Sequence, residues 1–144
     1  MTEPIIERLN EATAEAAEQI SRLLPQLTPR ADGIDVERLS RVVAGSGAVY
    51  VARVDGRIVG IIQRVDVHHV VRTKSWIEDF VVDEAMRGQG IATKLMQLAI
   101  DEAPADSQSI NLTSSSSRTS SHKVYAKFGF ELRDNATVWR LDIG

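Results

Sequence analysis

The sequence contains no cysteine, which excludes disulfide bonds, zinc sites with thiolate ligands and a cysteine nucleophile. Its three histidines lack a metal-ligand spacing such as HxxxH, so no metal site is expected. No apolar run approaches the roughly 20 residues that cross a bilayer. No basic segment followed by an apolar run indicates a signal peptide. We therefore expect a cytoplasmic protein that does not contact membranes.

Strong charge of either sign is also absent. The chain has 17 basic and 20 acidic residues, a formal net charge of −3, which gives no reason to expect nucleic-acid binding. Its 144 residues, 43% of them hydrophobic, are enough for one hydrophobic core. We expect a single domain that spans residues 1–144.

The hydrophobic periodicity predicts an α/β protein with a mixed, largely antiparallel sheet flanked by helices, in the order β-α-α-β-β-β-α-β-α-β-β. Pro25 is expected to end the first helix, and Asp55-Gly56 is a strong hairpin signal. The predicted strands are Ile5–Leu9, Ala48–Val54, Arg57–Arg64, Ser75–Val82, Ser109–Thr113, Phe130–Arg133 and Thr137–Ile143. The predicted helices are Thr13–Leu24, Asp35–Val43, Ile91–Ala103 and Thr119–Phe128, the last capped by Gly129.

The most informative segment joins the strand that ends at Val82 to the helix that begins at Ile91. Gly88 and Gly90 let the backbone approach a ligand closely, and the helix N-terminus adds partial positive charge. Such a turn suits a phosphate or diphosphate. The segment is neither a GxGxxG fingerprint nor a GxxxxGK[ST] loop. From the residues alone, an ordinary strand-to-helix turn that uses glycine remains the alternative.

Two motifs in this order resemble the GCN5-related N-acetyltransferases. Arg87-Gly88-Gln89-Gly90-Ile91-Ala92 matches the R/Q-x-x-G-x-G/A signature of that family, and Val124 to Phe130 is similar to its LYxKxGF segment. The resemblance covers residues 45–143, and the N-terminal helices fit it more loosely. It implies that acetyl-CoA is bound as a cosubstrate.

The resemblance also implies which residues contact acetyl-CoA. The backbone of the fourth strand would pair with the pantetheine arm, and the amides of Arg87 to Thr93 would bind the diphosphate. Arg118 stands where the family often has Asn. It could hold a phosphate or a substrate carboxylate, or be an ordinary surface residue. The implied contact residues are Phe80, Val81, Val82, Arg87, Gly88, Gln89, Gly90, Ile91, Ala92, Thr93, Asn111, Ser114, Arg118 and Lys127.

Acetyl transfer to an amine needs a base for the ammonium proton and an acid for the leaving thiolate. Tyr125 occupies the position where the family often carries the acid; the alternative is a partly buried packing residue. The run Ile77 to Phe80 resembles a segment of the polyamine acetyltransferases that borders the substrate, which makes Glu78 the favoured base and Asp79 its substitute. The alternative is that one of the two only caps or pairs with a neighbouring group. Because neighbouring strand residues face opposite sides, at most one of the two is expected in the cleft.

The sequence therefore predicts an N-acetyltransferase that acts on a primary amine, most simply of a small molecule such as a polyamine, amino sugar or amino acid. A protein lysine or N-terminus is the alternative acceptor. A non-catalytic acyl-CoA sensor or interaction module is the alternative outside enzymes. The resemblance also makes a homodimer through the C-terminal strands possible.

Overall fold

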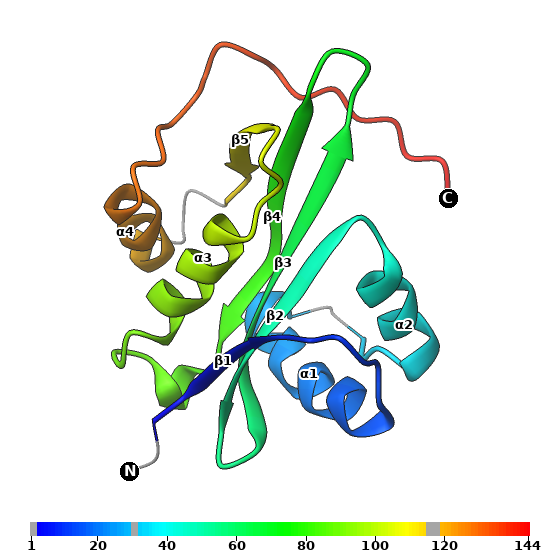
Figure 1. The fold of residues 1–144 in the computed structure, drawn as a ribbon, viewed down its shortest axis with the longest axis vertical. Helices are drawn as coiled ribbons and strands as arrows, with labels where there is room; N and C mark the ends of the chain where they lie inside the picture. The colour runs from blue at the N-terminus through cyan, green and yellow to red at the C-terminus, as the bar shows by residue number, and fades with distance from the viewer. Residues whose placement is uncertain (1–2, 30–31, 115–118) are drawn as a thin grey trace. The chain divides into compact units, whose positions relative to one another are not determined.

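Five strands form one mixed sheet in the order β1-β2-β3-β4-β5, in which only β4 and β5 run parallel (Figure 1). The computed structural model describes residues 3–29, 32–114 and 119–144. The chain divides into two compact units, Met1–Thr113 and Ser114–Gly144. The first unit contains β1 (Ile5–Arg8), α1 (Ala14–Leu27), α2 (Val36–Ala44), β2 (Gly47–Val54), β3 (Arg57–His68), β4 (Thr73–Val82), the short 3-10 helix η1 (Glu84–Met86), α3 (Ile91–Asp101) and β5 (Ser107–Leu112).

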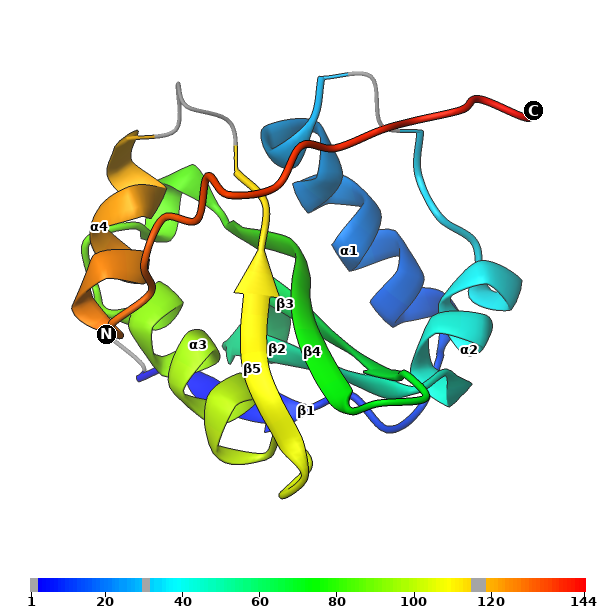
Figure 2. The same cartoon turned by 90° about the horizontal axis from the view of Figure 1, so that it is seen from above.

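Helices cover both faces of this sheet, with α1 and α2 on one face and α3 on the other (Figure 2). The alternation of side chains along the buried strand β2 explains this arrangement. Val49 and Val51 join the core cluster that contains the buried residues of α1 and α2. Tyr50, from the same strand, belongs to the other face, where it meets Arg64 beneath the end of α3.

The hairpin signal of the first unit is confirmed, and two helices there begin at side-chain caps. Asp55 and Gly56 both have positive φ (51° and 77°), as a two-residue hairpin turn requires. Thr13 and Asp35 cap α1 and α2 by accepting hydrogen bonds from the amides of Ala16 and Arg38.

The prediction that Pro25 ends the first helix is wrong, because α1 continues to Leu27. Proline removes one amide donor, and near the end of a helix this costs a single hydrogen bond. The helix still closes after it, since the amide of Thr28 donates to the carbonyl of Leu24 at 2.9 Å.

The position of α3 on the sheet depends on Gly60 of β3. A Cβ at this residue would come within 3.1 Å of Leu95 Cδ1 and 3.5 Å of Ile91 Cγ2, both from α3. Glycine therefore lets the helix approach the strand closely. This contact lies in the first turn and the middle of α3, next to the segment predicted to bind the diphosphate.

A buried ion pair fixes the opposite end of α3. The guanidinium of Arg64 forms two hydrogen bonds with the carboxylate of Asp66, at 2.9 and 3.2 Å. It also donates to the hydroxyl of Tyr50 at 2.7 Å and to the carbonyl of Ala99 at 3.0 Å. Ala99 belongs to the last turn of α3, whose carbonyls have no partners within the helix. Arg64 thus satisfies one of them and places a cation at the negative end of the helix dipole.

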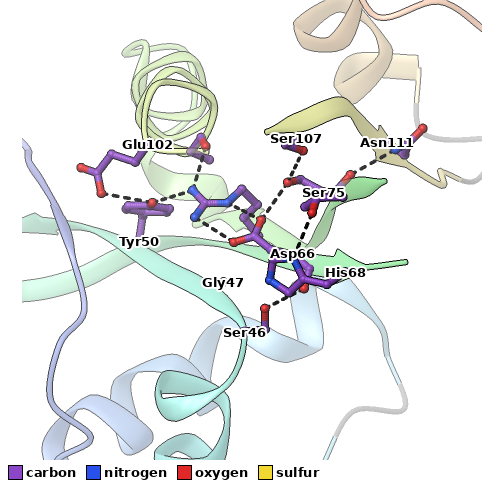
Figure 3. A network of polar contacts seen from close by, with 12 residues as sticks. Ser46, Gly47, Tyr50, Asp66, His68, Ser75, Glu102, Ser107 and Asn111 are labelled. Atoms are coloured by element: carbon purple, nitrogen blue, oxygen red, sulfur yellow. Dashed lines mark hydrogen bonds and ion pairs between the residues drawn. The ribbon is translucent and has the colours of Figure 1, made fainter. Parts of the chain in front are cut away.

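The same network reaches β4 and β5 (Figure 3). Ser75 of β4 donates to Asp66 at 2.7 Å and lies 2.8 Å from the hydroxyl of Ser107 in β5. Asn111, also in β5, donates to the carbonyl of Ser75 at 3.2 Å. At the other end, Tyr50 donates to Glu102 at 3.3 Å. These contacts connect α3, β2, β3, β4 and β5 below the point where β4 and β5 separate.

The second unit contains α4 (Thr119–Lys127). Gly129 has φ 88°, the amide of Phe130 bonds to the carbonyl of Tyr125, and the amide of Gly129 bonds to that of Ala126. This is a Schellman motif, so the predicted glycine cap is confirmed.

The strands predicted at Phe130–Arg133 and Thr137–Ile143 are not formed; residues 130–144 contain no strand. The apolar side chains that indicated strands there, among them Leu132, Trp139 and Leu141, are almost fully exposed. Alternating apolar residues and β-propensity indicate that a segment can pack on a pleated surface. Such a segment forms a strand only where a neighbouring strand completes its backbone hydrogen bonds.

Candidate functional site

The second half of β4 has a free edge in the described part of residues 1–113. The parallel pairing of β4 with β5 ends at Ile77 and Leu112. Beyond that point β4 continues to Val82 and pairs only with β3, on its other side. The backbone groups of Phe80, Val81 and Val82 that face away from β3 can therefore pair with an extended ligand. The pairing predicted for these three residues would use this edge.

A β-bulge interrupts β4 in this segment. Ile61 pairs with Val81 and Gln63 with Glu78, so two residues of β4, Asp79 and Phe80, lie opposite one residue of β3. Asp79 has φ 44°, in the left-handed region. Bulges re-aim side chains and often lie next to active sites. Sequence patterns do not predict this bulge, because the residue with positive φ is not glycine.

The bulge changes the expectation that only one of Glu78 and Asp79 faces the cleft. Regular alternation is lost at the extra residue, and both side chains are exposed. Loss of solvation, and then the negative charge of Asp79, raise the pKa of Glu78 above its ordinary value. A carboxylate with a raised pKa is a stronger base than a free one, as the predicted role of Glu78 requires.

The raised pKa predicts that Glu78→Gln stabilises the folded protein at neutral pH. A carboxyl group with a raised pKa in the folded state favours the protonated form, so stability falls as pH rises through its unfolded and folded pKa values. The free energy of unfolding of Glu78→Gln, from urea titration, should exceed that of the wild type at pH 7. The difference should vanish well below pH 4, where both chains are neutral at this position. A wild type more stable than the variant at pH 7 would contradict the assigned shift.

The amides of the loop after β4 are all engaged within the protein as far as Arg87. The amide of Asp83 donates to the carbonyl of Val59, that of Met86 to the carbonyl of Asp83, and that of Arg87 to the carbonyl of Glu84. The Arg87 side chain turns back toward β4 and donates to the carbonyl of Val82 at 3.3 Å. The amide of Arg87 is thus engaged within the loop, contrary to the prediction that it faces the diphosphate.

The amides that follow are placed to bind an anion. Gly90 is the N-cap of α3 and provides no side-chain cap. The amide of Lys94 donates to the carbonyl of Gly90 at 3.1 Å, as the first bond of the helix. The amides of Ile91, Ala92 and Thr93 therefore have no partners within the helix, and they lie at its positive end.

The space beside this turn can accommodate a ligand. Gly88 and Gly90 have φ of 81° and 79°, and a Cβ built on either glycine meets no atom within 4 Å. Positive φ turns successive amides toward one side, which makes a concave anion site. This geometry fits the diphosphate of a nucleotide cofactor.

The sequence of residues 12–130 matches the model of the acetyltransferase (GNAT) family. The chain belongs to this family. No curated protein matches by sequence.

Solved GNAT structures share the fold. An acetyltransferase from Trypanosoma brucei is 26% identical, with a TM-score of 0.75, and the match covers 98% of this chain and 100% of the other. An aminoglycoside acetyltransferase from an uncultured soil metagenomic sample, in complex with sisomicin, is 18% identical with a TM-score of 0.78, over 98% and 97% of the two chains. An aminoglycoside N-acetyltransferase in complex with CoA is 19% identical with a TM-score of 0.78, over 99% and 97%.

The other residues that the GNAT resemblance implicates belong to β5 of the first unit and to the second unit. Asn111 is the penultimate residue of β5, and its side chain is bonded to Ser75 and Ser109. Ser114 lies 3.4 Å from Nε2 of His122, at the start of the second unit. Tyr125 and Lys127 belong to the last turns of α4. Arg118 falls outside the described residues.

Tyr125 is held at the capped end of α4. Its ring packs edge-on against Phe130, with centroids 6.1 Å apart, and lies at the same distance from the ring of His122. Its carbonyl accepts the amide of Phe130 in the Schellman motif. The backbone and ring of Tyr125 are thus fixed within the second unit.

Neither a membrane-spanning helix nor a metal site occurs in the part of the chain that the structure describes. No helix there has both the length and the apolar character needed to cross a bilayer. No group of three or more His, Cys, Asp or Glu residues there is arranged to hold a metal ion.

Proposed function

We propose that the protein transfers an acetyl group from acetyl-CoA to a primary amine of a small molecule, as one domain of residues 1–144. The observation that carries this proposal is the free edge of β4 over residues 78–82, which leads directly into the turn of Gly88 and Gly90. An extended arm along the strand and a diphosphate at the start of α3 together match the two halves of CoA. The structure of a related fold that was solved with CoA supports this choice of ligand.

The predicted residues of β4, of the glycine turn and of α4 have separate chemical tasks in this proposal. The amides of Gly88 to Thr93 bind the diphosphate, and the backbone of Phe80 to Val82 pairs with the pantetheine arm. Glu78 takes the proton of the acceptor ammonium, directly or through water, with Asp79 beside it. Tyr125 donates a proton to the sulfur that leaves.

The acceptor is a metabolite with a protonated amine. Two exposed carboxylates at the β4 bulge attract such a cation, and two of the similar structures belong to aminoglycoside acetyltransferases. A polyamine, an amino sugar and an amino acid are the first candidates. A peptide N-terminus follows, since a ribosomal-protein-alanine N-acetyltransferase from Brucella melitensis shares the fold at 20% identity and a TM-score of 0.75, over 97% and 100% of the chains.

Release of free thiol from acetyl-CoA tests the proposal across a panel of these amines. At least one small amine should accelerate thiol release well above the rate with water alone. If only peptides with a free N-terminus or lysine do so, the acceptor class is wrong. Binding of CoA with no release for any amine would indicate an acyl-CoA sensor instead.

A further inference from the structure

We infer that Gln26, in the last turn of α1, is a positioning residue that fixes the loop before the diphosphate site; this inference rests on the function proposed above. The Gln26 side chain bonds to the loop twice. Its Oε1 accepts the amide of Glu84 at 2.8 Å, and its Nε2 donates to Oδ1 of Asp83 at 3.4 Å. The two partners lie 57 and 58 residues away in the sequence.

Asp83 organises this loop from within. Its amide donates to the carbonyl of Val59, and its carbonyl accepts the amide of Met86, both at 2.8 Å. Its Oδ1 accepts the amide of Ala85 at 3.2 Å and starts the short helix η1. Gln26 supplies the acceptor for the amide of Glu84. The amides on either side of it have other acceptors: that of Asp83 donates to the carbonyl of Val59 in β3, and that of Ala85 donates to Oδ1 of Asp83.

The path from Gln26 to the ligand is short. η1 spans Glu84 to Met86 and is followed directly by residues 87–90, which include the two glycines of the turn. A shift of the Glu84 peptide therefore moves the turn whose amides face the diphosphate. Misplaced hydrogen-bond donors lose affinity for a ligand even when all of them are present.

The side chain of Gln26 contributes little else. The residue is exposed, so it is not part of the hydrophobic core. A second glutamine of the same helix, Gln19, provides a matched comparison. Its Oε1 accepts the amide of Ile58 in β3 at 2.8 Å and does not touch the loop. Both side chains satisfy a backbone amide of another element, but only one of these amides belongs to the cofactor loop.

The substitutions Gln26→Met and Gln19→Met keep the length of each side chain and remove its hydrogen bonds. The dissociation constant for CoA, measured by calorimetry, should rise about fivefold in Gln26→Met, because the loop loses the two bonds that hold its amides in position for the diphosphate. It should be unchanged in Gln19→Met. The affinity for pantetheine, which lacks the diphosphate, should be the same in all three proteins when it is measured by NMR titration.

Three results would overturn the inference while the proposed function stands. The first is that wild type and Gln26→Met bind CoA with equal affinity. The second is that Gln19→Met loses as much affinity for CoA as Gln26→Met does. The third is that Gln26→Met loses as much affinity for pantetheine as for CoA. The last two would show a general effect of α1 on the fold. If the folded wild type binds no CoA at all, the proposed function fails, and the inference fails with it.

Discussion

Replacing Tyr125 by phenylalanine is expected to lower kcat by roughly 10²- to 10⁴-fold, the range over which general acid catalysis contributes. The leaving thiolate must acquire a proton, and the substitution removes only the hydroxyl that we propose as its source. The ring should stay in place, because its contacts with Phe130 and His122 and the backbone bond from Phe130 do not use the hydroxyl. The measurement is kcat at saturating acetyl-CoA with the best amine of the panel.

The chain contains only two tyrosines, so Tyr50→Phe is a matched control. That substitution removes a hydroxyl that bonds to Arg64 and Glu102 inside the protein. It should lower the free energy of unfolding by about 1 kcal/mol and leave kcat nearly unchanged. Equal kcat values for Tyr125→Phe and the wild type would remove Tyr125 from the mechanism.

Arg64→Met should have the largest effect on stability, a loss of about 3–5 kcal/mol in the free energy of unfolding. The substitution leaves the Asp66 carboxylate, which is only 7% exposed, without its cation. It also removes the donor to the carbonyl of Ala99 at the end of α3. Urea titration at neutral pH measures the loss, which is a large share of the total stability of a typical domain.

The pH dependence identifies the cause of this loss. Burial alone would raise the pKa of Asp66, but hydrogen bonds from Arg64 and Ser75 outweigh it and hold the pKa below its ordinary value. In the wild type, the ionised Asp66 carboxylate therefore adds to the free energy of unfolding. This stabilisation is fully present above the unfolded-state pKa of Asp66 and is lost as pH falls through its folded-state pKa. In Arg64→Met, burial should raise the pKa of Asp66, because the cation that lowers it is gone. The difference in the free energy of unfolding between the wild type and the variant should therefore become smaller in acid.

The double variant with Asp66→Asn, which carries no buried charge, should recover part of the loss at neutral pH. Arg64→Met would contradict this account if it unfolded within about 1 kcal/mol of the wild type, or if the gap widened in acid.

The features that the sequence predicted well depend on residues close together in the chain. Asp55-Gly56 and Gly129 adopt the expected positive φ because a turn or helix cap requires it locally. Gly88 and Gly90, which were expected to let the backbone approach a ligand closely, have positive φ in the turn before α3. The same local logic located the open turn that we propose as the diphosphate site.

The features that could not be predicted depend on pairing between distant segments. The bulge at Asp79 is a shift in the pairing register between β4 and β3, and no residue type in β4 indicates it. The bond from Gln26 to Glu84 spans 58 residues. The prediction of two C-terminal strands was wrong because it used the local pattern alone. A segment with a strand-like pattern does not form a strand without a partner strand.

Calorimetric titration of the folded protein with CoA, for the wild type, Gly90→Ala and Gly56→Ala, tests the central claim most directly. Both glycines have φ near 80° and open space around a built Cβ, so the backbone strain of the two substitutions is similar. Only Gly90 adjoins the amides assigned to the diphosphate. We predict saturable binding to the wild type and to Gly56→Ala, and binding about tenfold or more weaker to Gly90→Ala. No uptake of CoA by the wild type, or equal affinity of the two variants, would contradict the assignment of this turn.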